Sequence, residues 1–210
     1  MNDQEQSLEA IQDIKKMMER SSRFISLSGL SGVSAGIFAL AGSGFAYNLI
    51  NEYYYRYENR KGYDSNDFKE LTWNLTGLAM IILVCALLSA LYFTWRKARR
   101  NNLPVWDLTS KKLLINLSIP IITGGVFVFG LLHYSEWRFI APVCLIFYGL
   151  ALVNASKYTL SEIRYVGMIE IILGLINMWW IEYGLYFWAG GFGILHIIYG
   201  SLMWWKYDRA

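Results

Sequence analysis

The C-terminal third of the chain contains two adjacent apolar segments that constrain the fold more than any other feature. They are Leu160–Ile181 and Leu185–Trp205, joined by the short turn Glu182-Tyr183-Gly184. Each segment has about 21 residues, and at a rise of about 1.5 Å per residue such a helix crosses the roughly 30 Å hydrocarbon core of a bilayer. The sequence therefore predicts two antiparallel membrane helices, around which the rest of the chain packs.

Further apolar stretches extend this prediction to a polytopic membrane protein. Of the 210 residues, 55% are hydrophobic and 17% aromatic, more than a soluble domain of this size needs. We expect an all-α fold, in which a membrane helical bundle of six transmembrane helices occupies residues 24–210. The expected spans are about 24–50, 71–95, 113–133, 137–155, 160–181 and 185–205.

The distribution of Lys and Arg predicts the orientation of the bundle. Fourteen of these residues fall on the side that carries both termini, and only five fall on the opposite side. By the positive-inside rule, both termini are expected in the cytoplasm. Tryptophans are expected at both interfaces: Trp73, Trp137, Trp179, Trp180 and Trp188 at the outer one, and Trp95, Trp106, Trp204 and Trp205 at the inner one.

The first 23 residues predict a short amphipathic helix on the cytoplasmic side. Apolar residues at helical spacing form one face of it, and acidic and basic residues cover the rest. We expect this helix to lie on the membrane surface or on the cytoplasmic loops, and the alternative is that it docks a partner protein or a second copy of the chain. The net charge of +3 comes without a concentrated basic face, so nucleic-acid binding is not expected.

Two segments near the first span have a distinct composition. Gly32 and Gly36 lie in a stretch rich in Gly and Ser, which favours close packing against another helix. The following segment, Asn51–Glu70, carries five tyrosines among mixed charges. We expect this segment to form an external loop that covers the bundle as an interfacial lid, or else to offer a surface to a ligand or partner.

Small and polar residues form a stripe on each of the two C-terminal segments. The stripes are Gly167, Glu170, Gly174 and Asn177 on the first segment, and Ala189, Gly193, His196 and Gly200 on the second. In an antiparallel hairpin turning near Tyr183, residues at equal depth have numbers that sum to about 366. Both stripes obey this relation, so they are expected to face each other, with Glu170 opposite His196.

Glu170 and His196 are therefore the candidate site for a proton or a ligand, and Asn177 would extend it outward. An isolated charge at mid-bilayer costs at least about 2.5 kcal/mol, so each side chain is expected to face protein or water and to find a partner. The plainer interpretation is a structural polar clamp between two helices. These residues do not distinguish a proton from a small molecule as the occupant, and no metal-type cysteine spacing or cofactor motif occurs.

Three strings carry a resemblance to known proteins. The segments Arg20–Gly32, Ser156–Tyr165 and His196–Gly200 resemble a group of six-span bacterial membrane proteins without an assigned activity. This resemblance covers nearly the whole chain and implies a bacterial inner-membrane protein, but it supplies no catalytic or binding residue.

A second resemblance is to rhomboid proteases, which are also six-span proteins. Gly29-Leu30-Ser31-Gly32 and His196-x-x-x-Gly200 look like their serine and histidine motifs, which would make Ser31 a nucleophile and His196 its base. The order departs from that family, because rhomboids carry the serine in the fourth span and this chain has it in the first. The residues favour a non-enzymatic binding, transport or sensing module, with a partner-docking membrane subunit and an intramembrane hydrolase as the alternatives.

Overall fold

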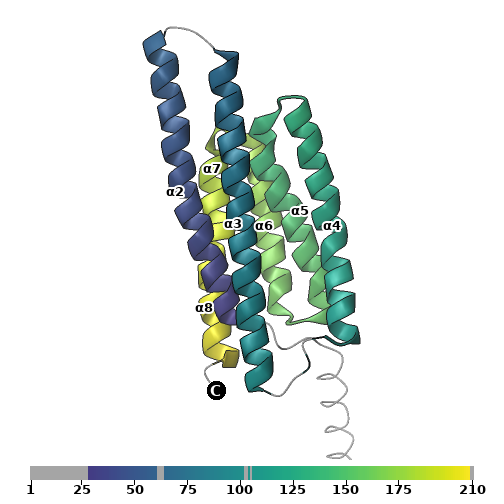
Figure 1. Ribbon diagram of the computed structural model, residues 1–210. Helices are drawn as coiled ribbons and strands as arrows, with labels where there is room; N and C mark the ends of the chain where they lie inside the picture. The colour runs from purple at the N-terminus through teal and green to yellow at the C-terminus, as the bar shows by residue number, and fades with distance from the viewer. Residues whose placement is uncertain (1–27, 61–63, 102–103, 105, 209–210) are drawn as a thin grey trace, which may run out of the picture.

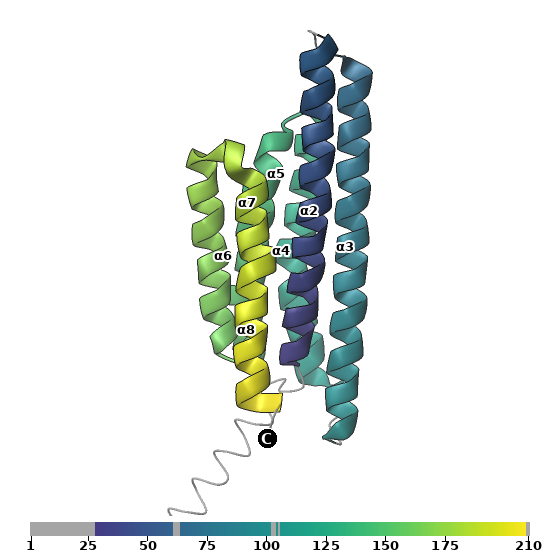
Figure 2. The same ribbon diagram turned by 90° about the vertical axis from the view of Figure 1, so that its left-hand side faces the viewer.

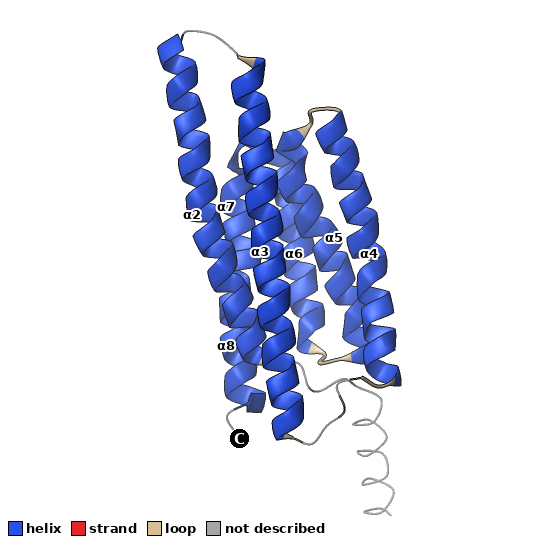
Figure 3. Ribbon diagram, in the orientation of Figure 1, coloured by secondary structure: helices blue, strands red, loops and turns tan. Residues whose placement is uncertain are grey.

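The computed structural model describes residues 28–60, 64–101, 104 and 106–208, and nearly all of them are helical (Figures 1 and 3). No strand occurs in these described segments, which confirms the all-α prediction. The helices lie roughly parallel or antiparallel to one another and form a single bundle. The expected amphipathic helix over residues 1–23 lies outside the described residues.

Helices α2 (Gly29–Arg60) and α3 (Ser65–Arg100) are antiparallel neighbours that pack against each other (Figure 2). The Asp64 side chain starts α3 by accepting a hydrogen bond from the backbone N–H of Asn66. Both helices extend past their neighbours at the end of the bundle opposite the C-terminus, which we call the distal end (Figure 1). At 32 residues α2 is about 48 Å long, well beyond the roughly 30 Å of a hydrocarbon core.

This extension corrects the prediction of a loop over Asn51–Glu70. Helix α2 continues through the tyrosine-rich sequence to Arg60, and α3 has already begun at Ser65. Polar and charged residues are compatible with a helix that extends into water. In this part of α2, Arg56 lies 3.5 Å from Glu52, one helical turn earlier, and such pairs stabilise an exposed helix. A loss of hydrophobicity therefore does not mark the end of a helix here.

The second pair of helices comprises α4 (Leu108–His133) and α5 (Ile140–Ala155). The short 3₁₀ helix η1 (Trp137–Phe139) lies between them and leads into α5. A reciprocal capping box between Asp107 and Ser110 starts α4. Helix α5 packs closely against both α4 and α6. Helix α5 therefore lies between α4 and the first arm of the C-terminal hairpin.

The C-terminal hairpin contains more elements than two simple helices. After η2 (Ser156–Tyr158), its first arm is α6 (Glu162–Trp179), and η3 (Ile181–Tyr183) makes the turn. The second arm is continuous but changes helix type: α7 (Gly184–Trp188), a π-helical segment η4 (Ala189–Leu195), α8 (His196–Met203) and a π-helical end η5 (Trp204–Asp208).

Five helical segments are long and apolar enough to cross a membrane, which indicates a membrane protein. They are Gly29–Asn59, Ser65–Arg100, Leu108–His133, Trp137–Tyr158 and Ile181–Asp208. Helix α6 is not among these five, since its 18 residues include three charged side chains. The described chain thus has five clear candidate spans, and α6 lies beside them with a more polar sequence.

Burial is concentrated on three of the helices. Helix α2 has seven buried residues, and α5 and α6 have six each, whereas α3 and α4 have two each. Large apolar side chains on α3 and α4 point outward, such as Ile81 and Phe129, which are 63% and 71% exposed. A continuous exposed apolar surface of this kind is expected of helices that face lipid.

The two glycine stripes face other helices than expected. Gly167 and Gly174 on α6 lie against α5, at the carbonyls of Gly149 and Pro142. On the last arm, Gly193 and Gly200 lie against α2, where Gly36 and Gly32 are their respective neighbours. The prediction that the stripes face each other is therefore wrong for the glycines. Each stripe instead allows close backbone contact with a helix outside the hairpin.

Candidate functional site

Glu170 lies at the middle of α6 and is fully buried, with 0% of its surface exposed. Neither of its carboxylate oxygens has a hydrogen-bond partner within the described part of the chain. The carboxylate packs against Gly191 of η4, where an added methyl group would collide with it and with the Leu145 side chain. A glycine at position 191 is therefore what allows α6 to bring a carboxylate into the bundle at this point.

His196 begins α8 and uses both ring nitrogens. Its Nδ1 lies 2.9 Å from the carbonyl oxygen of Gly191, and its Nε2 lies 2.8 Å from the Tyr148 hydroxyl. Because a carbonyl oxygen can only accept, Nδ1 carries a proton and donates it to Gly191. When the imidazole is neutral, Nε2 therefore accepts a hydrogen bond from Tyr148.

The Glu170 carboxylate lies beside this hydrogen-bonded ring. Its Oε1 is 3.5 Å from Nδ1 of His196, within ion-pair range but longer than a normal hydrogen bond. The structure thus brings together the two residues that the hairpin register sets at equal depth. The three groups Glu170, His196 and Tyr148, supplied by α6, α8 and α5, are named here the buried triad.

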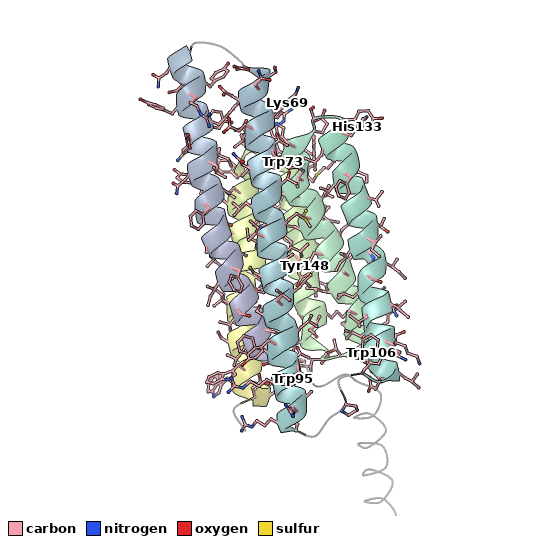
Figure 4. All side chains as sticks on the ribbon, in the orientation of Figure 1. Lys69, Trp73, Trp95, Trp106, His133 and Tyr148 are labelled. Carbon is pink, nitrogen blue, oxygen red and sulfur yellow. The ribbon has the colours of Figure 1, made fainter. Side chains whose placement is uncertain are left out.

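Tyr148 is the member of the triad that the sequence analysis missed. It lies in the middle of the apolar α5, far from the ends where tyrosines usually sit in membrane helices. Figure 4 shows it at mid-height in the bundle, between Trp73 toward one end and Trp95 and Trp106 toward the other. A lone tyrosine at mid-span is a signal that would have identified it, since its hydroxyl needs a partner there.

Aromatic rings line one side of the triad. The Phe192 ring centroid lies 5.1 Å from that of Tyr148 and 6.1 Å from that of His196. Trp188 packs on Phe192 with its ring centroid 4.6 Å away. These contacts hold the imidazole and phenol rings in place and give the site an apolar wall.

The π-helical segment η4 positions the histidine. A π-helix widens the turn and loosens the regular ladder of backbone bonds, and such segments occur frequently at functional sites. Here the Gly191 carbonyl accepts from the His196 ring five residues later. The local backbone therefore supplies an acceptor for Nδ1 that an ideal α-helix would use internally.

Asn177 is also fully buried but does not join the triad. Its Nδ2 donates to the Trp180 carbonyl at 2.9 Å, and its Oδ1 has no hydrogen-bond partner in the described segments. Seven residues of helix separate it from Glu170, a rise of about 10 Å. Its observed bond is at the C-terminal end of α6, where it secures the turn into η3.

The serine and histidine of the hydrolase hypothesis are not paired. The Ser31 hydroxyl donates to the carbonyl of Ser28, within its own helical end. Both nitrogens of His196 are engaged by Gly191 and Tyr148, and no described hydrogen bond joins His196 to Ser31. Within the described part of the chain, His196 therefore does not act as the base of a Ser31 nucleophile.

A second polar cluster ties the end of the chain to three helices. Asp208 lies 2.6 Å from Lys97 of α3, and it accepts hydrogen bonds from Ser28 and the backbone N–H of Gly29. Two residues earlier, Lys206 lies 2.6 Å from Glu162 of α6. We call this end of the bundle the C-terminal end.

Metal binding has no geometric support in the described residues, where no group of three or more His, Cys, Asp or Glu side chains is placed to hold an ion. Comparison of the chain with protein-family models, with curated proteins and with solved structures finds no match.

Proposed function

We propose that this chain is an integral inner-membrane protein of six spans that binds protons at the buried triad. The charge of the triad would change on proton binding, and this change serves sensing or transport rather than catalysis. The observation that carries the proposal is the fully buried carboxylate of Glu170, which no described group supplies with a hydrogen bond.

Helix α6 is the sixth span in this proposal. Its 18 residues reach about 27 Å, close to the thickness of a hydrocarbon core. Its charged residues Glu162 and Arg164 lie in its first turn, where they reach the membrane surface, so Glu170 is the one charge left within the span. The excess of Lys and Arg at the C-terminal end supports a cytoplasmic location for that end.

The energetics of burial favour a proton on the triad. A carboxylate at mid-bilayer costs at least about 2.5 kcal/mol unless it is neutralised. Two forms avoid this cost, either a protonated Glu170 beside a neutral His196, or a carboxylate beside an imidazolium 3.5 Å away. Both forms hold one shared proton, so the pair titrates as one unit and changes its net charge when a proton is added or removed.

The hydrogen-bond pattern supports a proton site rather than a structural clamp. In a clamp, Glu170 and His196 would bond directly to each other and hold two helices together. In the structure, the bonds of His196 go to Gly191 and Tyr148, and the carboxylate is left without a donor. A carboxylate that no direct hydrogen bond ties to another helix suits a group that gains and loses a proton.

Infrared spectroscopy of the full chain in lipid nanodiscs tests the proposal. A band from the protonated carboxyl group of Glu170 should appear and disappear as the pH is varied between about 4 and 10, the range in which carboxyl, imidazole and phenol groups titrate. The band should be absent from Glu170→Gln and retained in Glu182→Gln, whose carboxylate is exposed in η3. His196→Ala should displace the pH at which the band is lost.

The same experiment can refute the proposal. A spectrum in which no pH-dependent carboxyl band is lost on Glu170→Gln, while the protein stays folded, would mean that Glu170 exchanges no proton. The structural clamp would then be the correct interpretation of the site.

A further inference from the structure

An open cavity of about 500 Å³ lies at the C-terminal end of the bundle, between the start of α6 and the end of the last arm. Its lining residues are Glu162, Tyr199, Leu202, Met203, Trp205 and Lys206. Glu162 accepts hydrogen bonds from Lys206 at 2.6 Å and from Tyr207 at 2.7 Å. A charged pair thus lies at the edge of a cavity whose other lining side chains are mostly apolar, and the Lys206 side chain is 61% exposed.

Tyr199 connects this cavity with the buried triad. It follows His196 by three residues on α8, so the two side chains lie on the same side of the helix, one turn apart. Its hydroxyl oxygen is buried and has no hydrogen-bond partner among the described residues. Tyr199 also lines the cavity, so this residue lies between the cavity and the turn of α8 that carries His196.

The titratable groups that face the histidine come from α5 and α6, and Tyr207 joins Glu162 at the C-terminal end of the bundle. Tyr148 from α5 and Glu170 from α6 face the His196 ring. Helix α2, which packs on the opposite side of α8, presents Gly32 and Gly36 there. A proton that enters from the C-terminal end therefore meets Glu162 at the mouth, then Tyr199, and then Tyr148.

We propose that the buried triad exchanges protons with water through this cavity and the Tyr199 hydroxyl, so that it is open to the C-terminal end of the bundle. This inference rests on the proposed proton-binding function and adds the route and its direction. A proton from water in the cavity passes to the Tyr199 oxygen, which releases its own proton toward Tyr148. A bridging water covers any gap longer than a hydrogen bond.

The relay ends on the imidazole and the carboxylate beside it. Tyr148 passes its proton to Nε2 of His196 and receives one from Tyr199, so that each phenol regains its original composition. The neutral imidazole becomes an imidazolium whose Nδ1 lies 3.5 Å from the Glu170 carboxylate, and transfer of the Nδ1 proton gives a protonated Glu170 beside a neutral imidazole. The water in the cavity has lost one proton, the triad has gained one, and no oxidation or reduction is involved.

The rate of hydrogen–deuterium exchange at Glu170 tests this route. After transfer of the full chain in nanodiscs to D₂O, the isotope shift of the Glu170 carboxyl band reports how fast solvent protons reach it. We expect Tyr199→Phe to slow the exchange about five- to tenfold, because the substitution removes the hydroxyl that the proposed route places between the cavity and Tyr148. The control Tyr186→Phe, at an exposed position on α7, should leave the rate unchanged.

A labelled variant keeps the test valid if Tyr199→Phe does not fold. Leu202 lines the cavity and is 57% exposed, so Leu202→Cys can be modified with a bulky thiol reagent in a chain with Cys85→Ala and Cys144→Ala. Modification should slow the exchange, whereas the same reagent at Tyr186→Cys should not.

Two failures of this experiment have different meanings. If the Glu170 band is absent at every pH, the proposed proton-binding function fails. If the band is present but its exchange rate is the same in wild type, Tyr199→Phe and the labelled Leu202→Cys variant, the triad still binds protons and the route through the cavity is wrong.

Discussion

Energetic coupling between Glu170 and His196 is the most direct test of the buried triad. For a carboxylate and an imidazolium 3.5 Å apart, the Coulomb attraction at an effective dielectric constant of about 20 is about 5 kcal/mol. Removing two charges from water consumes most of this, and polar pairs in membrane proteins show net couplings of about 0.6 to 2 kcal/mol. We expect a coupling free energy in that range.

A double-mutant cycle on the free energy of unfolding measures this coupling. Glu170→Gln and His196→Ala should each destabilise the protein, because each leaves the charge of the other residue without its partner. In the double variant no charge is left unpaired, so its loss of stability should be clearly smaller than the sum of the two single losses. Reversible denaturation in detergent, followed by the loss of helical circular dichroism, gives the four free energies. Tyr148→Phe provides a separate reference, with an expected loss of about 0.5 to 1.5 kcal/mol for one hydrogen bond.

The outcome that refutes the pairing is additivity. If the double variant equals the sum of the two single variants to within about 0.3 kcal/mol, the residues are energetically independent. The 3.5 Å approach would then have no consequence for stability, and a shared proton would lose its physical basis.

Three further predictions concern packing and orientation. Gly191→Ala should destabilise the protein by about 1 to 3 kcal/mol, because the added methyl group would collide with the buried carboxylate of Glu170. Gly190→Ala is the control and should not destabilise it, because position 190 has open space around it. Thermal unfolding in detergent compares the two variants. Gly36→Leu should also lower the melting temperature, because Gly36 lies against a backbone carbonyl of η4; an unchanged melting curve would mean that this contact is absent. An impermeant thiol reagent added to the outside of cells should modify Arg60→Cys and spare Arg100→Cys, and the reverse pattern would overturn the orientation.

The bundle and the pairing of Glu170 with His196 could be predicted because they depend on short-range rules. Apolar runs of about 20 residues determine which segments are helical, and an antiparallel hairpin with a short turn determines which residues share a depth. The faces of the glycine stripes could not be predicted in the same way. A stripe indicates that some helix approaches closely, but α5 and α2 were available as partners along with the other arm of the hairpin.

The remaining differences have equally local causes. The extension of α2 to Arg60 was not predicted from hydropathy. A fall in hydropathy indicates where a helix leaves the lipid, but the helix itself can continue into water because its backbone hydrogen bonds persist there. Tyr148 escaped because it belongs to a different apolar segment, and only the packing of α5 beside α8 brings its hydroxyl to the imidazole. The π-helical segment η4 could not be predicted, because it does not change the spacing of apolar residues in the sequence in a recognisable way, although two consecutive glycines lie within it.

The π-helical segment η4 also makes the second arm sensitive to length in a way that substitutions do not reveal. A π-helical turn holds about one residue more than an α-helical turn, so deleting one residue within Ala189–Leu195 would let the segment relax to regular α-helix while the two ends of the arm keep their relative orientation. The regular helix would then use the Gly191 carbonyl in its own hydrogen-bond ladder, and the His196 ring would lose this acceptor. Related chains that carry the triad should therefore conserve the number of residues between Trp188 and His196 more strictly than the identities of those residues.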